Sequence, residues 1–285
     1  MSEAARNLLR AWLVRRLDAK QGAWLDEQIA ALRQDPADTA LDIALGMVPR
    51  RLGKAELALT AADLAAAERA VPGWDPRGWG VAEAARILVL GSLPAAGKPF
   101  AERFRALCRT ADVAELVTLY RGLPLYPDPA ALEEQVGEGL RSNMRVVFEA
   151  IAHRNPYPKA HFDDHRWNHM VLKALFIGSP LAPIQGLDER ANPQLARIMC
   201  DFAHERWAAG RPVPFEIWRC VGPFAEGQAL EDLARVLASG EARERRAAAL
   251  ALAASPDRRA AELLGEVPQL AGEISGKRLT WATLQ

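Results

Sequence analysis

The chain has 285 residues, half of them hydrophobic, and its 36 basic and 36 acidic side chains give a formal net charge of zero. A chain of this length can bury a sizeable core, as one large domain or as two small ones. Zero net charge provides no general attraction to nucleic acid or to an anionic membrane surface. We therefore expect no nucleic-acid partner.

No run of about 18 apolar residues, the length of a membrane-spanning helix, occurs in the sequence. The first stretch, "MSEAARNLLRAWLVRRLDAK", is amphipathic and charged throughout, unlike a secretory signal. We expect a cytoplasmic protein without direct membrane insertion. The three cysteines, Cys108, Cys200 and Cys220, form no C-x-x-C pair, which argues against a disulfide framework or a thiolate zinc site.

The residue pattern predicts an all-α protein, because Ala, Leu, Glu and Arg dominate and apolar residues recur every three or four positions. Pro, Gly and Asp residues punctuate this pattern and set the helix ends. The predicted helices are 2–18, 22–33, 37–48, 60–70, 80–91, 98–108, 111–121, 128–153, 164–177, 193–209, 228–238, 241–254 and 257–264.

Short connections between neighbouring helices predict irregular stacked helix pairs, an α-solenoid-like arrangement. The segment "ASGEARERRAAALALAASPDRRAAELLGEV" is typical of a HEAT-like pair near the carboxyl terminus. Changes in composition and punctuation predict an N-terminal helical region over 1–127, a motif-rich central region over 128–226 and a HEAT-like cap over 227–285. These three regions can also form one domain.

Three histidines, His161, His165 and His169, follow one another at four-residue spacing, which is a spacing found among metal ligands. A structural zinc site usually needs four ligands, and neither a cysteine nor a clear fourth partner lies near them. His165 and His169 also fall on the polar face of the predicted helix. We predict that these histidines hold no metal.

Asn143, Asn168 and Arg206 each interrupt the apolar face of a predicted helix. A buried arginine keeps its charge, so Arg206 needs a carboxylate, helix-end carbonyls or an anionic ligand. One interpretation is a structural network, in which the amides bond to the backbone and Arg206 pairs with Asp188 or caps its own helix. The other is a pocket where the three groups converge on the polar part of a small molecule.

The pocket interpretation assigns further ligand-binding residues around the three polar groups, with aromatic walls for the apolar part of the molecule. These are Trp167, Trp207, Trp218 and Arg190. Asp201 and His204 lie one helical turn apart and are candidates for a catalytic acid–base couple. The alternative for that couple is an exposed i,i+3 pair without a catalytic role.

Three long segments resemble the EboA family of bacterial helical proteins: "GLRSNMRVVFEAIAHRNPYP" (139–158), "WNHMVLKALFIGSPLAPIQGLDERANPQLARI" (167–198) and "DFAHERWAAGRPVPFEIWRCVGPF" (201–224). A looser resemblance extends over 47–59, 72–90 and 111–127, and so covers most of the chain.

The resemblance implies that the protein takes part in a secondary-metabolite pathway. Genes of this family lie beside genes for a prenyltransferase-like membrane protein and several metabolic enzymes. In cyanobacteria, gene clusters of this kind are associated with movement of a pigment precursor out of the cytoplasm, and the resemblance implies a role of that type. The family motif usually has glutamine where this chain has His169, which further weakens the metal interpretation.

The sequence contains no P-loop, G-x-G-x-x-G, G-x-S-x-G, H-E-x-x-H or D-D-x-x-D motif. We therefore predict a helical accessory or binding protein without a cofactor. Its predicted partner is a small amphipathic metabolite or another pathway protein, including the prenyltransferase-like membrane protein. The alternative is an enzyme that acts on a small anionic or prenylated substrate through Asn143, Asn168, Arg206 and His204.

Overall fold

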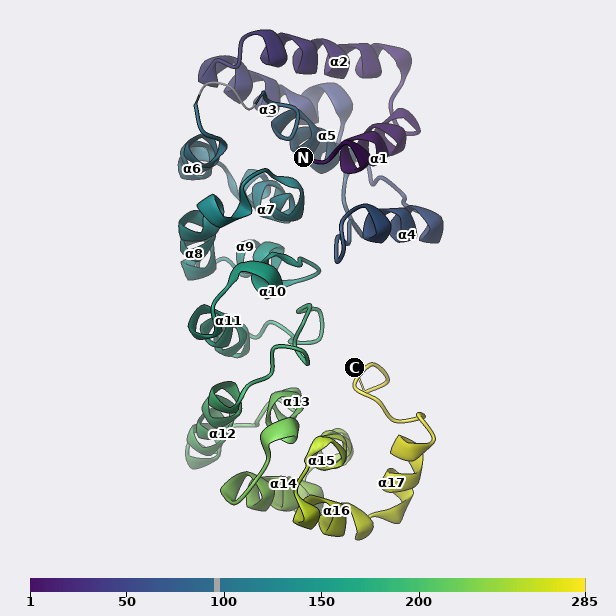
Figure 1. The fold of residues 1–285 in the computed structure, drawn as a ribbon, viewed down its shortest axis with the longest axis vertical. Coiled ribbons are helices and arrows are strands. Elements are labelled where there is room, and N and C mark those ends of the chain that lie inside the picture. The colour runs from purple at the N-terminus through teal and green to yellow at the C-terminus, as the bar shows by residue number, and fades with distance from the viewer. Residues whose placement is uncertain (95–97, 285) are drawn as a thin grey trace. The chain divides into compact units, whose positions relative to one another are not determined.

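The structure is a computed structural model that describes residues 1–94 and 98–284 (Figure 1). Over these residues it contains 17 α-helices and no strand, which confirms the predicted all-α class. The chain forms two compact units, Met1–Phe162 and Asp163–Gln285, named unit 1 and unit 2 below. The predicted three-region division and the HEAT-like pair stay predictions.

Unit 1 begins with seven α-helices and continues with two short 3-10 helices and three further α-helices (Figure 1). Their bounds are α1 Glu3–Val14, α2 Ala19–Gln34, α3 Asp38–Leu52, α4 Ala61–Ala70, α5 Val81–Leu90, α6 Phe100–Thr110, α7 Val113–Arg121, η1 Leu123–Leu125, η2 Pro129–Leu132, α8 Glu133–Arg141, α9 Arg145–Ala152 and α10 Tyr157–His161.

Polar capping residues determine where several of these helices begin. Asp18, Thr60 and Asp112 precede α2, α4 and α7, and each accepts a bond from the backbone N–H three residues later. In each case the side chain at that later position bonds back to the backbone of the capping residue. Such capping boxes satisfy two N–H groups that a helix start leaves unpaired.

The helix predicted over 128–153 is wrong, because the chain forms η2, α8 and α9 with a break between Arg141 and Arg145. In this break the hydroxyl of Ser142 accepts a hydrogen bond from the backbone N–H of Met144 at 3.1 Å. A side chain that bonds to nearby backbone in this way competes with helix formation. Asn143 consequently lies on the surface, so its predicted burial in a helix face is also wrong.

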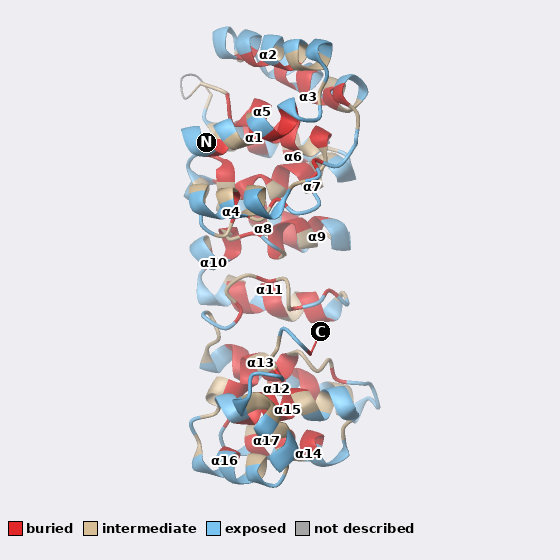
Figure 2. Ribbon diagram, turned by 90° about the vertical axis from the view of Figure 1, so that its right-hand side faces the viewer, coloured by how far each residue is buried: buried red, intermediate tan, exposed pale blue. Residues whose placement is uncertain are grey.

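Helix α5 forms the centre of unit 1, since every residue in it except Glu83 is buried. It packs against α1, α3 and α7 (Figure 2). A helix that is apolar on all sides is expected to be enclosed by its neighbours. Arg86 differs from the other buried residues of this helix because its side chain is charged.

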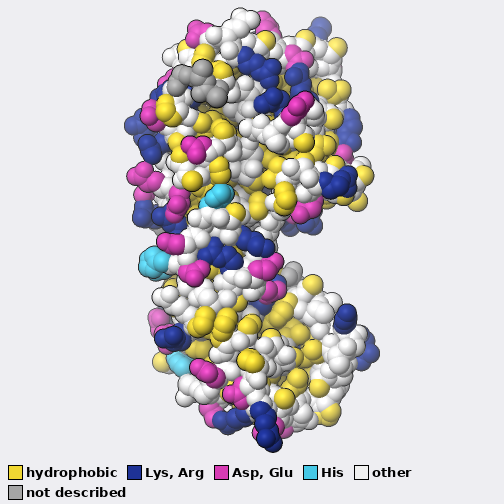
Figure 3. All heavy atoms as spheres, in the orientation of Figure 1, with side chains coloured by type: hydrophobic (Ala, Val, Ile, Leu, Met, Phe, Trp, Pro, Cys, Tyr) yellow, Lys and Arg dark blue, Asp and Glu magenta, His cyan; other side chains and the backbone are white. Residues whose placement is uncertain are grey.

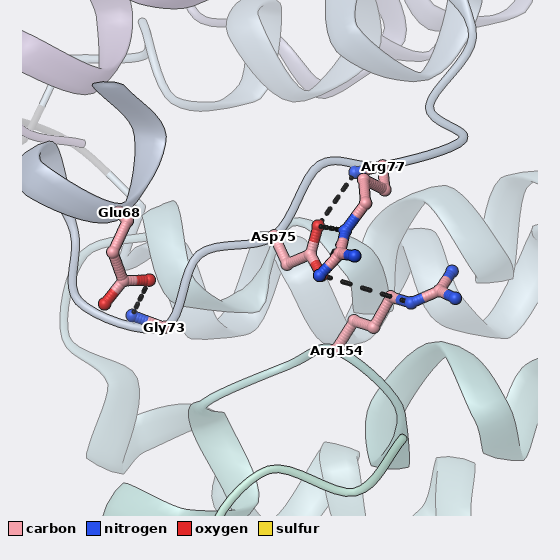
Figure 4. Close-up of polar contacts among 5 residues, drawn as sticks. All are labelled: Glu68, Gly73, Asp75, Arg77 and Arg154. Atoms are coloured by element: carbon pink, nitrogen blue, oxygen red, sulfur yellow. Dashed lines mark hydrogen bonds and ion pairs between the residues drawn. The ribbon is translucent and has the colours of Figure 1, made fainter. Parts of the chain in front are cut away.

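The loop before α5 is held by a polar cluster around Asp75 (Figure 4). Arg77 donates to both carboxylate oxygens of Asp75, and Arg154 lies 4.0 Å from the same carboxylate. Nearby, Glu68 accepts a bond from the backbone N–H of Gly73. These contacts join the loop to α4 and to the chain after α9.

Unit 2 consists of seven α-helices and one 3-10 helix within the described residues (Figure 1). Their bounds are α11 Asp164–Phe176, α12 Pro193–Ala208, α13 Ile217–Val221, η3 Gly222–Phe224, α14 Gln228–Ser239, α15 Ala242–Ala254, α16 Arg258–Gly265 and α17 Pro268–Ser275. No helix of either unit, over the residues described, is long and apolar enough to cross a membrane.

Helix α15 is the centre of unit 2, where it contacts α13, η3, α14, α16 and α17. Its buried residues are mostly alanines, which let neighbouring backbones approach closely. One close approach is at Gly222, where an added Cβ would lie 2.7 Å from the carbonyl oxygen of Ala251. A side chain at this position would therefore force the neighbouring backbone to shift.

Candidate functional site

A pocket of about 640 Å³ lies in unit 2 between α12, η3 and the start of α14. One part of its lining is apolar and includes Pro193, Ala196, Phe224 and Ala229. The other part carries polar and ionisable side chains, namely Arg197, Cys200, Asp201, His204, Glu226, Gln228, Asp232 and Asp257. The pocket thus joins an apolar wall to a set of convergent polar groups.

The central contact of the pocket is between His204 of α12 and Asp232 of α14. Nε2 of His204 lies 2.7 Å from Oδ2 of Asp232, and Asp232 is only 4% exposed. Gln228 donates to the other carboxylate oxygen at 3.3 Å. A buried carboxylate that bonds one ring nitrogen fixes the orientation of the imidazole.

Asp201 and His204 both line the pocket, but the predicted acid–base couple between them is not the contact formed. Among the described residues, the carboxylate that hydrogen-bonds His204 is that of Asp232. Asp201 is exposed at the pocket rim. The side chain that orients His204 therefore comes from a different helix.

Cys200 lies on the wall of the pocket, one residue before Asp201. Burial raises the pKa of its thiol to about 12, and the negative charges of Asp232 and Asp201 act in the same direction. Because the thiolate is the nucleophilic form, this thiol is poorly suited to covalent catalysis at neutral pH.

Asn168 is 1% exposed and pairs with Asn192, which precedes α12. Its Nδ2 donates to Oδ1 of Asn192 at 3.2 Å, and Nδ2 of Asn192 donates to its Oδ1 at 2.9 Å. Oδ1 of Asn192 also accepts the backbone N–H of Leu195, which caps α12. The buried amide thus joins α11 to the start of α12.

Trp167, the residue before Asn168 in α11, contacts Arg190. Trp167 is fully buried and the Arg190 guanidinium lies 4.9 Å from its ring centroid. The same guanidinium donates to Asp164 at 2.7 Å. A cation over an indole face and a carboxylate partner account for the position of Arg190.

Arg206 is partly exposed, in contrast to its predicted position in the middle of a buried face. Its Nε donates to the carbonyl of Pro212 at 2.5 Å, so it holds the chain that follows α12. The predicted partner Asp188 instead forms two hydrogen bonds with Arg219. This contact is neither of the two structural alternatives for Arg206, because the acceptor is not Asp188 and Pro212 lies beyond the end of α12 at Ala208.

Asn168 and Arg206 do not converge. Asn168 bonds at the first residue before α12, and Arg206 lies about 20 Å further along the same helix at 1.5 Å per residue. Trp207 stacks on Trp218 at a centroid distance of 5.9 Å, and no tryptophan is among the described residues that line the pocket. The ligand-binding roles assigned to Asn143, Asn168, Arg206, Trp167, Trp207 and Arg190 stay predictions.

The three spaced histidines lie on two helices. His161 ends α10 in unit 1 and packs on Tyr157, whereas His165 and His169 belong to α11 in unit 2 with ring centroids 4.3 Å apart. Within the described residues no group of three or more His, Cys, Asp or Glu side chains is arranged to hold a metal ion.

Sequence reasoning missed Asp232, the most buried polar group of the pocket. Leu230, Leu233 and Val236 form the buried stripe of α14, and Asp232 lies four residues before Val236 at its edge. An acidic residue at the edge of an apolar stripe was therefore the available signal. The pairing with His204, 28 residues earlier, has no local signature.

A family model described as "Metabolite traffic protein EboA" matches residues 5–222. No curated protein and no solved structure matches the chain significantly. The matched segment includes unit 1 and the α12 wall of the pocket, while α14 follows it. Because the match extends over more than half of the sequence, the chain belongs to the EboA family of metabolite traffic proteins.

Proposed function

We propose that the chain is an accessory protein of a secondary-metabolite pathway that binds a small amphipathic molecule in the pocket between α12, η3 and α14. The pocket is the observation that supports this proposal most directly. Its volume of about 640 Å³ lies within the range of about 300–1,000 Å³ typical of small-molecule sites. The family description fits a protein that carries a metabolite rather than one that transforms it.

The lining supports a ligand with an apolar body and a polar, uncharged or cationic end. Phe224 and Ala229 belong to the apolar wall. Arg197 is outnumbered by the carboxylates that share the pocket, which are Asp201, Glu226, Asp232 and Asp257. Like charges raise the free energy of an anion in such a site. An anionic substrate, one of the two kinds named in the enzyme alternative, is therefore disfavoured at this pocket.

The binding function is tested by native mass spectrometry of the full chain after incubation with a small-molecule extract of the organism that carries the gene. Wild-type protein should retain a discrete added mass. Ala229→Trp should lose it, because the indole occupies the pocket. Ala238→Trp, on the exposed side of the same helix, is the matched control and should retain the mass.

The His204–Asp232 contact favours catalysis as the second candidate function. With Nε2 bonded to Asp232, Nδ1 is the nitrogen left to exchange a proton with a ligand. If the protein is an enzyme, the extract compound should be consumed and a product should appear, and His204→Ala should stop this conversion. Retention of an unchanged compound by wild-type protein favours the carrier function.

We further propose that the chain delivers the bound molecule to a pathway protein in the cytoplasm. A prenyltransferase-like membrane protein is one such partner. The description of the family as metabolite traffic proteins supports delivery in general. The prenyltransferase-like partner is what the sequence resemblance implies. Affinity capture of the tagged chain from its own organism should recover a pathway protein. Ala229→Trp and Ala238→Trp, compared in the same assay, separate ligand-dependent capture from a constitutive complex.

A further inference from the structure

A second pocket lies in unit 1, between α3, α5, α6 and α7, with a volume of about 250 Å³. Its deep wall is aliphatic and is formed by Leu45, Leu90 and Leu119, all buried. Asp42 and Thr110, both exposed, lie at its mouth. Nothing in the proposed function of unit 2 uses this pocket.

Arg86 is the basic residue in the described lining of this pocket, and it is only 8% exposed. Its Nε donates to the carbonyl of Leu45 at 3.0 Å. Pro49, inside α3, has no N–H with which to bond that carbonyl four residues earlier. The guanidinium therefore replaces a missing helical hydrogen bond, and this contact fixes its position.

A second contact neutralises Arg86. Its Nη2 donates to Oε1 of Glu115 at 2.8 Å, and the other carboxylate oxygen of Glu115 accepts the backbone N–H of Asp112. Each carboxylate oxygen has two acceptor sites, so Glu115 retains capacity for another donor. The pair thus presents an acceptor beside a guanidinium at the pocket wall.

The guanidinium also retains a donor. Among the described residues, no acceptor bonds Nη1 of Arg86, and Nη1 is not one of the buried polar atoms that lack a partner. Nη1 therefore retains some exposure, and Arg86 is one of the residues that line the pocket. An accessible donor and acceptor side by side match a group that both accepts and donates a hydrogen bond.

We propose that this pocket binds a neutral, mainly aliphatic molecule whose polar end is a primary amide or an alcohol. The polar end accepts from Arg86 and donates to Glu115, while the aliphatic part contacts the leucines. An apolar cavity of about 150 Å³ accepts benzene, so this pocket has room for a somewhat larger molecule, of about ten non-hydrogen atoms.

Charge decides between a neutral ligand and a charged one. Arg86 is balanced by Glu115, and Asp42 adds a further negative charge at the mouth. A carboxylate would meet two like charges, Glu115 and Asp42, and only one opposite charge. An ammonium would meet one like charge and two opposite ones, so the loss of its hydration is what opposes its binding. A charged end would also lose its hydration in a leucine-lined space, which is costly.

Isothermal titration of the full chain with three probes of equal length tests this proposal: octanamide, octanoate and octylammonium at pH 7. Octanamide should bind, and the other two should bind at least tenfold more weakly. Nuclear Overhauser contacts from octanamide to the methyl groups of Leu45, Leu90 and Leu119 should place it in the pocket. These contacts are read on wild-type protein and need no variant.

Two variants complete the test. Ala111→Phe should remove octanamide binding by filling the pocket, and Ala229→Trp in unit 2 should leave it unchanged. Glu115→Gln removes one negative charge and should improve octanoate binding at least threefold. The proposal is overturned if octanoate equals octanamide in wild-type protein, if octanamide does not bind, or if its contacts lie outside the three leucines.

Discussion

Nε2 of His204 lies 2.7 Å from Oδ2 of Asp232, and the two side chains differ sharply in exposure. The imidazole is 42% exposed, whereas the carboxylate is 5% exposed. The contact therefore connects a group that a ligand can reach to one that is held inside unit 2. A buried carboxylate depends on its partner more than an exposed imidazole does.

This asymmetry predicts unequal effects on stability. His204→Ala leaves the carboxylate of Asp232 with Gln228 alone and should lower the free energy of unfolding by about 2–3 kcal/mol, less than a fully buried pair because His204 is partly exposed. Asp232→Asn removes the charge and should cost about 1 kcal/mol. Urea unfolding of both variants checks this order, and equal losses would contradict it.

Gly222 has little room for a side chain. The atoms that an added Cβ would meet are backbone atoms of Ala251, at 2.7 and 2.8 Å, and backbone cannot rotate away. Gly222→Ala should therefore lower the free energy of unfolding by about 1–3 kcal/mol.

The matched control for Gly222 is Gly272, inside α17, where an added Cβ meets nothing within 4 Å. Gly272→Ala should raise stability by about 0.5–1 kcal/mol, because alanine favours a helix over glycine. Thermal or urea unfolding of the two variants should give effects of opposite sign. Destabilisation by both substitutions would mean that space at Gly222 is not the cause.

Periodicity predicted most helices within a few residues, because amphipathic stripes and capping residues are local features. It failed between Arg141 and Arg145, where the apolar pattern continues but the Ser142 hydroxyl bonds to the Met144 backbone. A hydrogen bond that competes with the helix leaves the apolar spacing unchanged, so periodicity alone misses it. The error placed Asn143 inside a helix face.

The candidate pocket was predicted less well than the helices. His204 and Asp201 were identified from their one-turn spacing, and both line the pocket. Asp232 and Phe224 join them only through the packing of α14 and η3 against α12, which no local pattern specifies. Arg206 was misplaced because its long side chain reaches the Pro212 carbonyl beyond the helix end.

Asp63 should contribute a pH-dependent part of the stability of unit 1. Burial opposes ionisation of Asp63, but hydrogen bonds from Arg15 and Thr60 outweigh it and lower its pKa from 3.8 to about 2. Because the pKa of Asp63 is lower in the folded than in the unfolded state, its ionised carboxylate stabilises the fold at pH values above the unfolded-state pKa. This contribution disappears as the pH falls from about 4 to 2.

Asp63→Asn should therefore cost about 1 kcal/mol at pH 7, a value reduced for solvent screening near the surface. At pH 2 the difference between Asp63→Asn and wild-type protein should shrink, because the wild-type carboxyl becomes protonated. Unfolding measured at both pH values checks the sign. A difference that grows on acidification would contradict the assigned contacts.

Cys200 should react slowly with thiol reagents. Its pKa of about 12 leaves roughly a thousandth of the thiolate that a thiol of pKa 9 has at pH 8. Alkylation by iodoacetamide at pH 8, followed by mass spectrometry of the peptide that contains Cys200, should be far slower in native than in urea-unfolded protein. Equal rates would show that the thiol is not shielded on the pocket wall.

Asn168 and Arg206 should differ in what their removal costs. Asn168→Ala leaves the partly buried amide of Asn192 without its reciprocal partner and weakens the junction between α11 and α12. A buried polar group that loses its partner costs about 1–3 kcal/mol, and the lower end of this range is expected for the partly buried Asn192. Arg206→Ala removes a partly exposed guanidinium from the Pro212 carbonyl and should cost less than about 1 kcal/mol.

The same two variants decide whether these residues belong to the ligand site. Neither lines the pocket around His204, so both should retain the metabolite mass that Ala229→Trp loses. A stable Arg206→Ala protein that fails to retain the mass would assign Arg206 to binding. Since Arg206 lies at the end of α12 where His204 also lies, that result would extend the pocket toward the chain after α12.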